Sequence, residues 1–472
     1  MRKKPIYHCR DEVGFPIWSQ YRDTHNRRNL RNYGIKLPMK GVSVMVHVIG
    51  QDGQPLMPTN RHGKVKHLLK SGKAKVVRRC PFTIKLLYRS TNYIQNLTLG
   101  QDTGSGTHGN AVYAEDGKII YMSKVIVRND ITNRMTQRAK YRRSRRNRKT
   151  RYRKPRFLNR KNSIRDNRFS PTMVSKIQSH VREIEFIRLI LPVTTIVLET
   201  GQFNTHLMKN PALANEKVCH WGYQKGTNYG FENTRAMVLN RDGYQCQCCK
   251  GRHRDTKLEV HHIVFRSQGG SDEADNLITL CHTCHKALHD GKINPNFKGK
   301  KKGQLKYATQ MNSIRKQLLR IYPDAIETFG MVTKANRLSL GIEKDHHIDA
   351  CIIASGGNPF VFATDTVFVK RNVAKGDYQK TKGIRSEQLI TTGKIRGFRK
   401  FDKVKYFGKY YFIKGRMSTG YAILMDVKGN KIDFSSMPKG MKIPKLSDCK
   451  RVAARSSQMI CAMKLKKALS LR

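Results

Sequence analysis

Two pairs of closely spaced cysteines have the clearest chemical potential in this sequence. Cys246 and Cys249 form one C-x-x-C pair, and Cys281 and Cys284 form a second about thirty residues later. Two such pairs at this spacing are typical of a tetrahedral zinc site, in which four thiolates stabilise a small domain with little core of its own. Cys248 lies inside the first pair and is an alternative ligand. The sequence therefore predicts a structural zinc site.

Histidines and an asparagine near these cysteines could add catalysis. His261 and His262 are adjacent, Asn276 follows, and His285 comes directly after the last cysteine. One histidine of such a set can deprotonate a water while another binds a metal ion near a scissile phosphate. The same histidines could instead be extra zinc ligands or surface residues, and the spacing alone leaves that choice open.

Four further ionisable residues lie in three blocks far apart in the sequence. Asp102 ends an apolar strand before a glycine-rich turn, and Glu199 ends the short apolar segment 195–199. His346 and Asp349 are three residues apart, so a helix would place them on one face. Carboxylates suit Mg²⁺, and a pair of such ions stabilises both the attacking and the leaving oxygen in phosphodiester hydrolysis. Each acid alone is weak evidence, but the three blocks together favour an RNase H-like nuclease core.

The elements that must position these groups follow from the hydrophobic pattern. Strands are predicted over 97–102, 110–114 and 119–127, and the apolar residues of 172–191 recur at a helical period that ends at Pro192. Before them, residues 44–88 predict a small αβ module with a short helix.

Positive charge dominates the composition. The 472 residues include 93 Lys and Arg against 33 Asp and Glu, a formal net charge of +60. Such a surplus strains a compact fold unless a polyanion neutralises it, and nucleic acid and a membrane surface are the main candidates. We find no apolar run that could span a bilayer and no secretory signal, and eleven scattered cysteines do not require a disulfide framework. These features favour a nucleic-acid partner, no membrane, and a reducing intracellular compartment.

The charge is densest in one interior segment. About half of residues 134–168 are Lys or Arg. A nuclear-import tract or a solvated tail is the ordinary explanation of such a run. Because predicted structure flanks it on both sides, we expect an arginine-rich helix or connector that binds a phosphate backbone, since each guanidinium pairs two phosphate oxygens. The expected nucleic-acid-binding residues are Arg138, Arg142, Arg143, Arg145, Arg146, Arg148 and Arg151.

The motifs and their order resemble a known family. The His-His, Asn and His residues inside paired zinc knuckles resemble the HNH nuclease ββα-metal fold, and the three flanking blocks resemble a split RuvC nuclease. Together with the arginine-rich segment and the motif Pro55-Leu-Met-Pro58, this layout resembles IscB, the compact transposon-encoded relatives of the CRISPR effectors that cut both strands. The segments 382–402 and 415–421 also resemble this family, so the resemblance extends over 44–425.

The resemblance implies roles for the site residues. In the HNH region, His262 would be the general base, His261 and His285 would hold the catalytic ion, and Asn276 would fix the loop that orients the base. In the RuvC region, the catalytic and metal-binding residues would be Asp102, Glu199 and Asp349, with His346 also catalytic. The first block commonly reads Asp-Pro-Gly in this family, whereas this chain has Thr103 between the acid and the glycine.

An α/β multidomain fold follows from the same resemblance, with a split RNase H-like RuvC core and an inserted HNH domain. The expected regions are a basic extension at 1–43 (Met45 lies where an initiator would fit), a PLMP domain at 44–92, RuvC segments at 93–130, 171–215 and 296–358, a bridge helix and connector at 131–170, the HNH domain at 216–295, and a β-rich domain at 359–472 that would contact ωRNA and a target-adjacent motif.

The function implied is that of an RNA-guided DNA endonuclease in the prokaryotic cytoplasm, associated with the nucleoid when it binds DNA. A monomeric protein would bind one ωRNA, and HNH would cut the guide-paired strand of double-stranded DNA while RuvC cut the displaced strand. The expected ions are two Mg²⁺ in RuvC, one Mg²⁺ in HNH and one structural Zn²⁺. Two alternatives stay open: a protein-guided HNH endonuclease of homing or restriction type, which leaves the RuvC blocks unexplained, and a nucleic-acid-binding protein with decayed sites.

Overall fold

The computed structural model describes residues 45–147, 169–209, 228–299, 305–374, 394–438 and 442–465. The unassigned extension 1–43 lies outside these ranges. Within them, no helix is long and apolar enough to cross a membrane.

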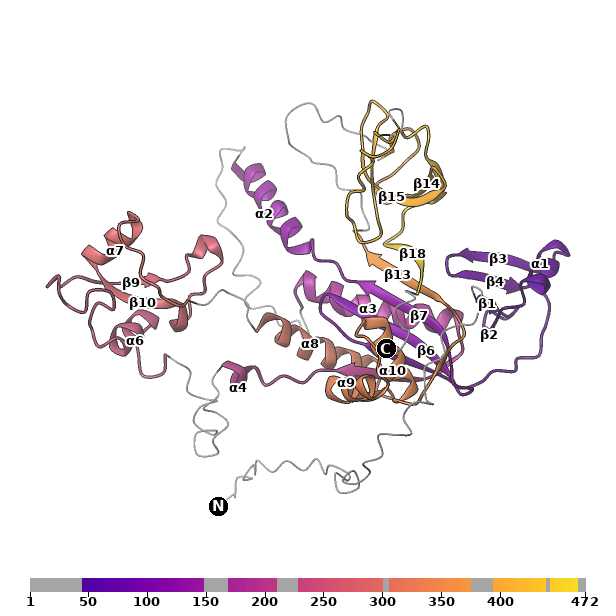
Figure 1. The fold of residues 1–472 in the computed structure, drawn as a ribbon, viewed down its shortest axis with the longest axis horizontal. Coiled ribbons are helices and arrows are strands. Elements are labelled where there is room, and N and C mark those ends of the chain that lie inside the picture. Colours follow the sequence, from indigo (N-terminus) through magenta and orange to yellow (C-terminus); the bar gives the residue numbers. More distant parts are fainter. Residues whose placement is uncertain are drawn as a thin grey trace, which may run out of the picture.

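An eight-stranded mixed sheet forms the centre of the molecule (Figure 1). Its order is β11-β8-β5-β6-β7-β13-β18, and β12 pairs with β7 beside this path. The strands are β5 (Leu97–Asp102), β6 (Thr107–Ala114), β7 (Lys118–Ile126), β8 (Val193–Thr200), β11 (Ile326–Phe329), β12 (Val361–Phe362), β13 (Thr366–Asn372) and β18 (Gln458–Lys464). The strands β5, β6 and β7 form an antiparallel meander, as the sequence predicts, and β8 lies parallel to β5.

Helices cover both faces of this sheet because alternate residues of its strands are apolar on each side. On one face, α3 (Pro171–Ile190) and α8 (Lys306–Ile321) enclose a core that includes Leu99, Ile184 and Leu318. On the other, α10 (His346–Ser355) encloses a second core with Ala111 and Met122. Helix α9 (Gly330–Ser339) packs beside α10.

Smaller units extend from this centre. The N-terminal module is a four-stranded sheet, β2-β1-β4-β3, with one helix, and the PLMP motif lies in its strand β2. Its elements are β1 (Val46–Ile49), β2 (Pro55–Thr59), α1 (His62–Lys70), β3 (Ala74–Arg79) and β4 (Phe82–Leu86). The basic segment begins as helix α2 (Ile131–Asn147), which projects away from the sheet (Figure 1).

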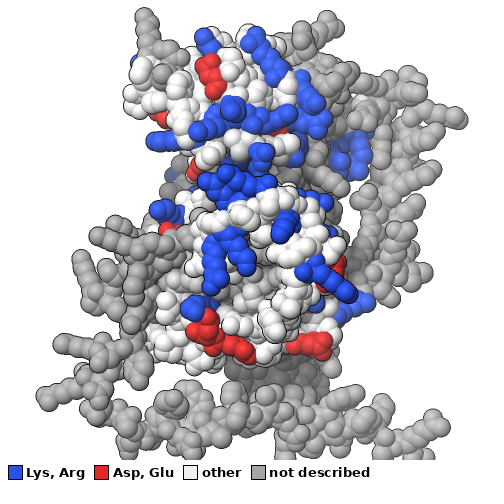
Figure 2. Space-filling view, turned by 90° about the vertical axis from the view of Figure 1, so that its right-hand side faces the viewer, with Lys and Arg blue, Asp and Glu red and all other residues white. Residues whose placement is uncertain are grey.

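The C-terminal region divides between two sheets. Strands β14 (Lys403–Tyr406), β15 (Lys409–Arg416), β16 (Ala422–Met425) and β17 (Lys450–Ala453) form a separate four-stranded sheet. Strands β12, β13 and β18 instead join the central sheet, which differs from the expected boundary at residue 359. Among the charged residues of the face shown in Figure 2, on the side of the N-terminal module, Lys and Arg cover more of the surface than Asp and Glu.

A small unit is inserted between β8 and α8. It contains α6 (Thr234–Arg241), β9 (Leu258–His262), β10 (Leu277–Cys281) and α7 (His282–His289), and the short helix α4 (Thr205–Lys209) precedes it. The chain leaves and re-enters the core at neighbouring points. There the Asn312 side chain accepts a hydrogen bond from the Phe203 amide at 2.9 Å and donates one to the Phe203 carbonyl at 2.7 Å.

Candidate active sites

Three carboxylates from separate blocks converge at one edge of the central sheet. Asp102 and Glu199 end neighbouring parallel strands and are paired in register, which places both at the same edge. Asp349 lies in the first turn of α10, and His346 begins that helix and donates a hydrogen bond from Nδ1 to Asp102 Oδ2 at 2.6 Å. The structure thus brings together all four residues that the sequence singled out in these blocks.

Two glycines allow α10 to lie close enough for this convergence. A Cβ built at Gly100 on β5 would lie 2.5 Å from the Ala350 carbonyl oxygen, and one at Gly109 on β6 would lie 1.8 Å from the His346 carbonyl oxygen. Gly109 is also paired with Asp102 across the β5–β6 ladder. Only residues without a side chain fit between helix and sheet here, so both glycines help to bring Asp349 to Asp102.

The electrostatics of this cluster suit divalent cations. Burial, reinforced by the negative charges of Asp102 and Asp349, raises the pKa of Glu199, and burial followed by repulsion from Asp102 raises the pKa of Asp349. Glu199 Oε2 and Asp349 Oδ1 are buried without a hydrogen bond, although Arg337 Nε lies 3.2 Å from the latter oxygen in poor bonding geometry. Crowded, unsatisfied carboxylate oxygens fit hard cations such as Mg²⁺.

Helix α3 holds the turn that follows Asp102. The Gly104 amide donates to His180 Nε2 at 3.3 Å, and His180 Nδ1 donates to the Lys176 carbonyl at 2.9 Å. The Lys176 ammonium donates to the Ser105 carbonyl, and the Thr103 hydroxyl donates to the Glu199 carbonyl at 2.6 Å. Lys176 and His180 were not among the residues predicted from the sequence, because nothing local distinguishes them from other polar residues of a helix.

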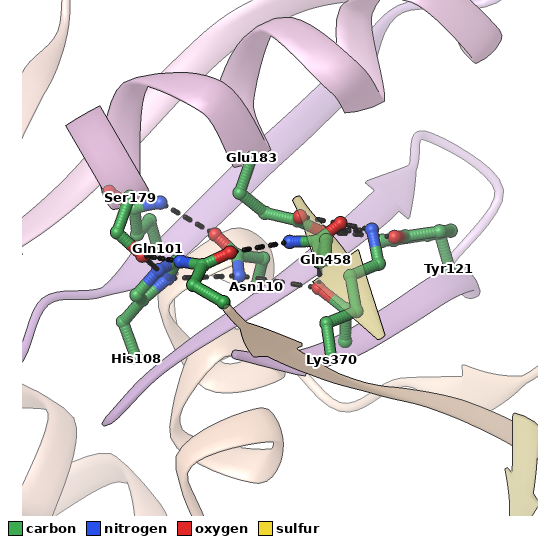
Figure 3. Close-up of polar contacts among 10 residues, drawn as sticks. Gln101, His108, Asn110, Tyr121, Ser179, Glu183, Lys370 and Gln458 are labelled. Carbon is green, nitrogen blue, oxygen red and sulfur yellow. Dashed lines mark hydrogen bonds and ion pairs between the residues drawn. The ribbon is translucent and has the colours of Figure 1, made fainter. Parts of the chain in front are cut away.

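A buried polar network continues from this turn beneath α3 (Figure 3). The Lys370 ammonium donates to both oxygens of Glu183 at 2.7 and 2.9 Å, and the exposed fractions of these side chains are 0% and 1%. Tyr121 and Ser123 also donate to Glu183. These contacts fasten α3 to β7 and β13.

The inserted unit has a ββα arrangement. Strands β9 and β10 pair antiparallel, with Ile278 opposite His261, and helix α7 follows β10 directly. His261, His285 and His289 form a cluster in which one ring nitrogen from each lies within 4.8 Å of the other two. Burial, followed by repulsion from the other two histidines, lowers the pKa of His261 to about 4, so this imidazole is neutral and able to bind a metal ion.

His289 is the third member of this histidine cluster, and it was not among the residues predicted from the sequence. It lies four residues after His285 on α7, a spacing that places both on one face of a helix and could have identified it. Glu259 Oε2 lies 2.6 Å from His285 Nδ1, so it orients that ring and leaves Nε2 toward the cluster. Three imidazoles suit transition ions such as Zn²⁺, Ni²⁺ or Cu²⁺, whereas Mg²⁺ prefers oxygen ligands.

His262 and Asn276 lie beside this cluster. His262 Nε2 lies 3.1 Å from Asp272 Oδ1. Asn276 is fully buried and its side chain bonds three backbone groups: it accepts from the Val264 amide and donates to the Val264 and Ser271 carbonyls, all within 3.0 Å. Asn276 therefore closes the loop that follows His262.

The four cysteines of the paired knuckles form a second cluster. Cys246, Cys249, Cys281 and Cys284 offer sulfur atoms within 4.8 Å of one another, the donor set of a structural zinc site. Cys248 does not belong to it. His253 Nδ1 lies 3.5 Å from Cys284 Sγ and is an additional polar neighbour.

The predicted phosphate-binding arginines are only partly described. Arg138, Arg142 and Arg143 lie on α2. Arg145 and Arg146 lie on the same helix, but their side chains fall outside the described set, and Arg148 and Arg151 fall outside the described residues altogether.

Comparison with known proteins identifies two regions. A model described as "RRXRR protein" matches residues 46–226, a range that includes the sequence Arg-Arg-Ser-Arg-Arg at 142–146. A model described as "HNH endonuclease" matches residues 246–291, which contain both the cysteine and the histidine clusters. Residues 246–291 therefore form an HNH endonuclease domain. The order of an RRXRR region followed by an HNH domain supports the resemblance to compact HNH nucleases of the IscB type that the motifs indicate.

Individual relatives match only parts of this endonuclease. Anaredoxin of Nostoc sp. is 34% identical over 65 residues, which cover 14% of this chain and 83% of that protein. The type IV methyl-directed restriction enzyme EcoKMcrA of Escherichia coli is 51% identical over 65 residues, covering 12% of this chain and 23% of the enzyme. A Streptococcus thermophilus Cas9 structure overlaps 52% of this chain and 32% of its own, at 12% identity and a TM-score of 0.30. The chain thus spans less than a third of that nuclease and of EcoKMcrA.

Proposed function

We propose that this protein is an RNA-guided DNA endonuclease that cuts both strands of a matched duplex. The observation that carries the proposal is the presence of two separate centres, the carboxylate cluster of Asp102, Glu199 and Asp349 on the sheet and the histidine cluster on the insert. A duplex has two antiparallel strands, and two centres of different chemistry on separate units can each cut one.

In the carboxylate centre, a split RuvC site, Asp102, Glu199 and Asp349 would hold two Mg²⁺ ions. When bound, such ions stabilise the attacking and leaving oxygens of an in-line displacement. His346 is held by Asp102, and this bond raises the pKa of the imidazole, so His346 is able to exchange a proton beside the phosphate. Lys176 and His180 keep the turn after Asp102 in place.

In the HNH centre, His261, His285 and His289 would hold one divalent ion, and their nitrogen donors favour a transition ion over the Mg²⁺ expected from the sequence. Asp272 accepts a hydrogen bond from Nε2–H of His262, and in this tautomer Nδ1 is the nitrogen that can take a proton from water. Asn276 fixes the loop after His262. The four cysteines would bind Zn²⁺ and stabilise the unit as a whole.

Guidance by RNA is supported by charge and architecture. The net charge of +60 exceeds what a short DNA site needs, and a large structured RNA of the ωRNA type supplies the missing counter-charge. Sequence would then be read by base pairing, while the protein binds backbone and shape and reads a short adjacent motif. A protein-guided HNH endonuclease, the alternative, has no use for the carboxylate centre.

A strand-resolved cleavage assay tests this proposal. The purified protein, with its co-purifying RNA identified by sequencing, is given a duplex that matches the guide and is labelled on both strands. Asp102→Ala should leave only the nick in the guide-paired strand, and His262→Ala only the nick in the displaced strand. Asp116→Ala, which removes a carboxylate from an exposed turn, is the matched control. If either site variant stops both cuts while still binding DNA, or if no defined RNA co-purifies, the proposal is wrong.

A further inference from the structure

A cavity of about 690 Å³ lies where the arginine-rich helix α2 diverges from α3. One wall is a single face of α2, formed by residues 131, 134, 135 and 138, and the other is a face of α3 that extends over residues 171–182. Asn372, Val373 and Ser457 line it from the ends of β13 and β18. The volume is within the 300–1,000 Å³ that is usual for sites of small ligands.

The lining combines apolar surface with arginines. Ile131, Met135, Phe169, Val174 and Val373 supply the apolar part. The charged lining residues are Arg128, Arg134, Arg138 and Arg182, and none of the described lining residues is acidic. The cavity is therefore positively charged and also offers an aromatic ring to a planar ligand.

Two of the four arginines form no ion pair with a carboxylate in the described part of the chain, so their guanidinium groups can pair with a ligand. Arg128 and Arg134 both pair with Asp130, which offsets part of their charge. Arg138 is exposed on α2, and Arg182 contacts only the Ser457 hydroxyl, at the long distance of 3.5 Å, within the described part of the chain. Two guanidinium groups on opposite walls can bind one phosphate between them.

The floor of the cavity is held in place by the network beneath α3. Asn372 Nδ2 donates to Ser179 Oγ at 2.6 Å, and Gln458 Nε2 donates to Asn372 Oδ1 at 3.2 Å (Figure 3). Ser179 Oγ also bonds with His108 Nε2 at 3.1 Å. Polar groups fixed in this way bind a ligand without the entropic cost of ordering side chains.

We propose that this cavity binds one nucleotide of a single-stranded nucleic-acid segment, with its base against Phe169 and Met135 and its phosphate between Arg138 and Arg182. A base inside a duplex is covered by its neighbours, so only an unpaired, unstacked nucleotide presents an apolar face and a phosphate together. A peptide without acidic groups or a lipid tail would leave the arginines unpaired. This inference deepens the proposed function, on which it rests for a nucleic-acid partner.

Salt-dependent binding tests the phosphate contact. Arg182→Ala is compared with Arg188→Ala, which removes an equal charge from α3 outside the cavity, where Arg188 pairs with Glu185. The probes are a short single-stranded RNA and a DNA of the same sequence, bound to the full chain at several salt concentrations. Arg182→Ala should reduce the slope of log K against log salt by about 0.7, the value for one lost phosphate contact on a single strand. Arg188→Ala should leave it unchanged.

Filling the cavity and cross-linking test the base contact. Ser175→Trp places a ring inside the cavity and should weaken binding roughly five- to hundred-fold, the range expected for one base stacked on an aromatic residue. With 4-thiouridine in the RNA probe or 4-thiothymidine in the DNA probe, irradiation should give an adduct at Phe169 or Met135, and the more efficient probe identifies the nucleic acid.

The outcomes separate the two proposals. If the chain binds neither probe nor any cellular RNA, the proposed function fails together with this inference. If binding persists, but Arg182→Ala and Arg188→Ala give the same slope of log K against log salt and no adduct forms at Phe169 or Met135, only the inference fails. A Ser175→Trp variant that fails to fold does not alter this decision, because the arginine pair and the adduct decide it alone.

Discussion

Replacing Gly109 by alanine should slow the proposed cut of the displaced strand and leave the cut of the guide-paired strand unchanged. Gly109 lies on β6 beneath the start of α10, and a Cβ built there would lie 1.8 Å from the His346 carbonyl oxygen and 2.9 Å from the His347 amide nitrogen. Both atoms belong to the backbone of α10, so no side-chain rotation relieves the clash. The start of α10 must therefore move away from the sheet.

The size of this movement follows from the distances. Real Cβ atoms essentially never lie closer than 3.0 Å to such an atom, so the His346 carbonyl must recede by more than roughly 1 Å. The hydrogen bond from His346 Nδ1 to Asp102 Oδ2, now 2.6 Å, would then exceed bonding distance, and Asp349 on the same turn would move with it. A displacement of about 1 Å in a catalytic arrangement costs about 10²-fold in rate.

The assay is strand-resolved cleavage, with Gly106→Ala as the matched control. A Cβ at Gly106, three residues earlier, meets no atom within 4 Å. Gly109→Ala should slow cleavage of the displaced strand about 10²-fold, while cleavage of the guide-paired strand stays normal and demonstrates that the variant is folded. Equal displaced-strand rates in the two alanine variants would refute the reasoning.

Three further predictions concern the HNH centre and the buried groups. Glu259→Gln should weaken metal binding at the histidine cluster about 10- to 100-fold, as loss of a carboxylate that orients a ligand usually does, and titration calorimetry with Zn²⁺ should detect it; unchanged affinity would contradict the role given to Glu259. Lys370→Met should destabilise the core by about 3–5 kcal/mol in urea unfolding because it leaves the buried Glu183 carboxylate without its cation, and adding Glu183→Gln should restore part of this loss; a double variant less stable than the single one would contradict this. Burial lowers the pKa of His180 to about 4, and since an unfolded histidine titrates near 6.5, the stabilisation is complete above pH 6.5 and falls by up to about 3 kcal/mol as the pH drops toward 4. Urea midpoints at pH 7 and 5 should therefore differ less in His180→Gln than in the native chain, and an equal difference would refute this.

Local patterns were sufficient to predict the strands that carry Asp102 and Glu199 and the helix that packs against them. The helix expected over 172–191 is α3, Pro171–Ile190, because its apolar period and Pro192 define its face and its end. The segment 195–199 lies within β8, and the acids at the ends of β5 and β8 lie side by side. Hydrophobic periodicity and chain order contain this information.

Long-range pairing was beyond the reach of the sequence. Strands β13 and β18 complete the central sheet, yet about ninety residues separate them, and both lie in the region 359–472 that was expected to form a separate domain. The role of Lys176 and His180 depends on α3 passing over the turn after Asp102, which only the fold defines. His289, in contrast, was identifiable from its helical spacing to His285.

The two hydrogen bonds between Phe203 and Asn312 suggest that another segment can take the place of the HNH unit. They join the two ends of the insertion at the core. Helix α8, which packs on the sheet, begins at Lys306, so the replaceable chain ends before that residue. A Gly/Ser linker from residue 204 to residue 305, which keeps the whole of α8, should give a nickase that keeps the carboxylate centre. The same junction could accept another small domain, such as a deaminase or a fluorescent reporter, whose termini lie close together.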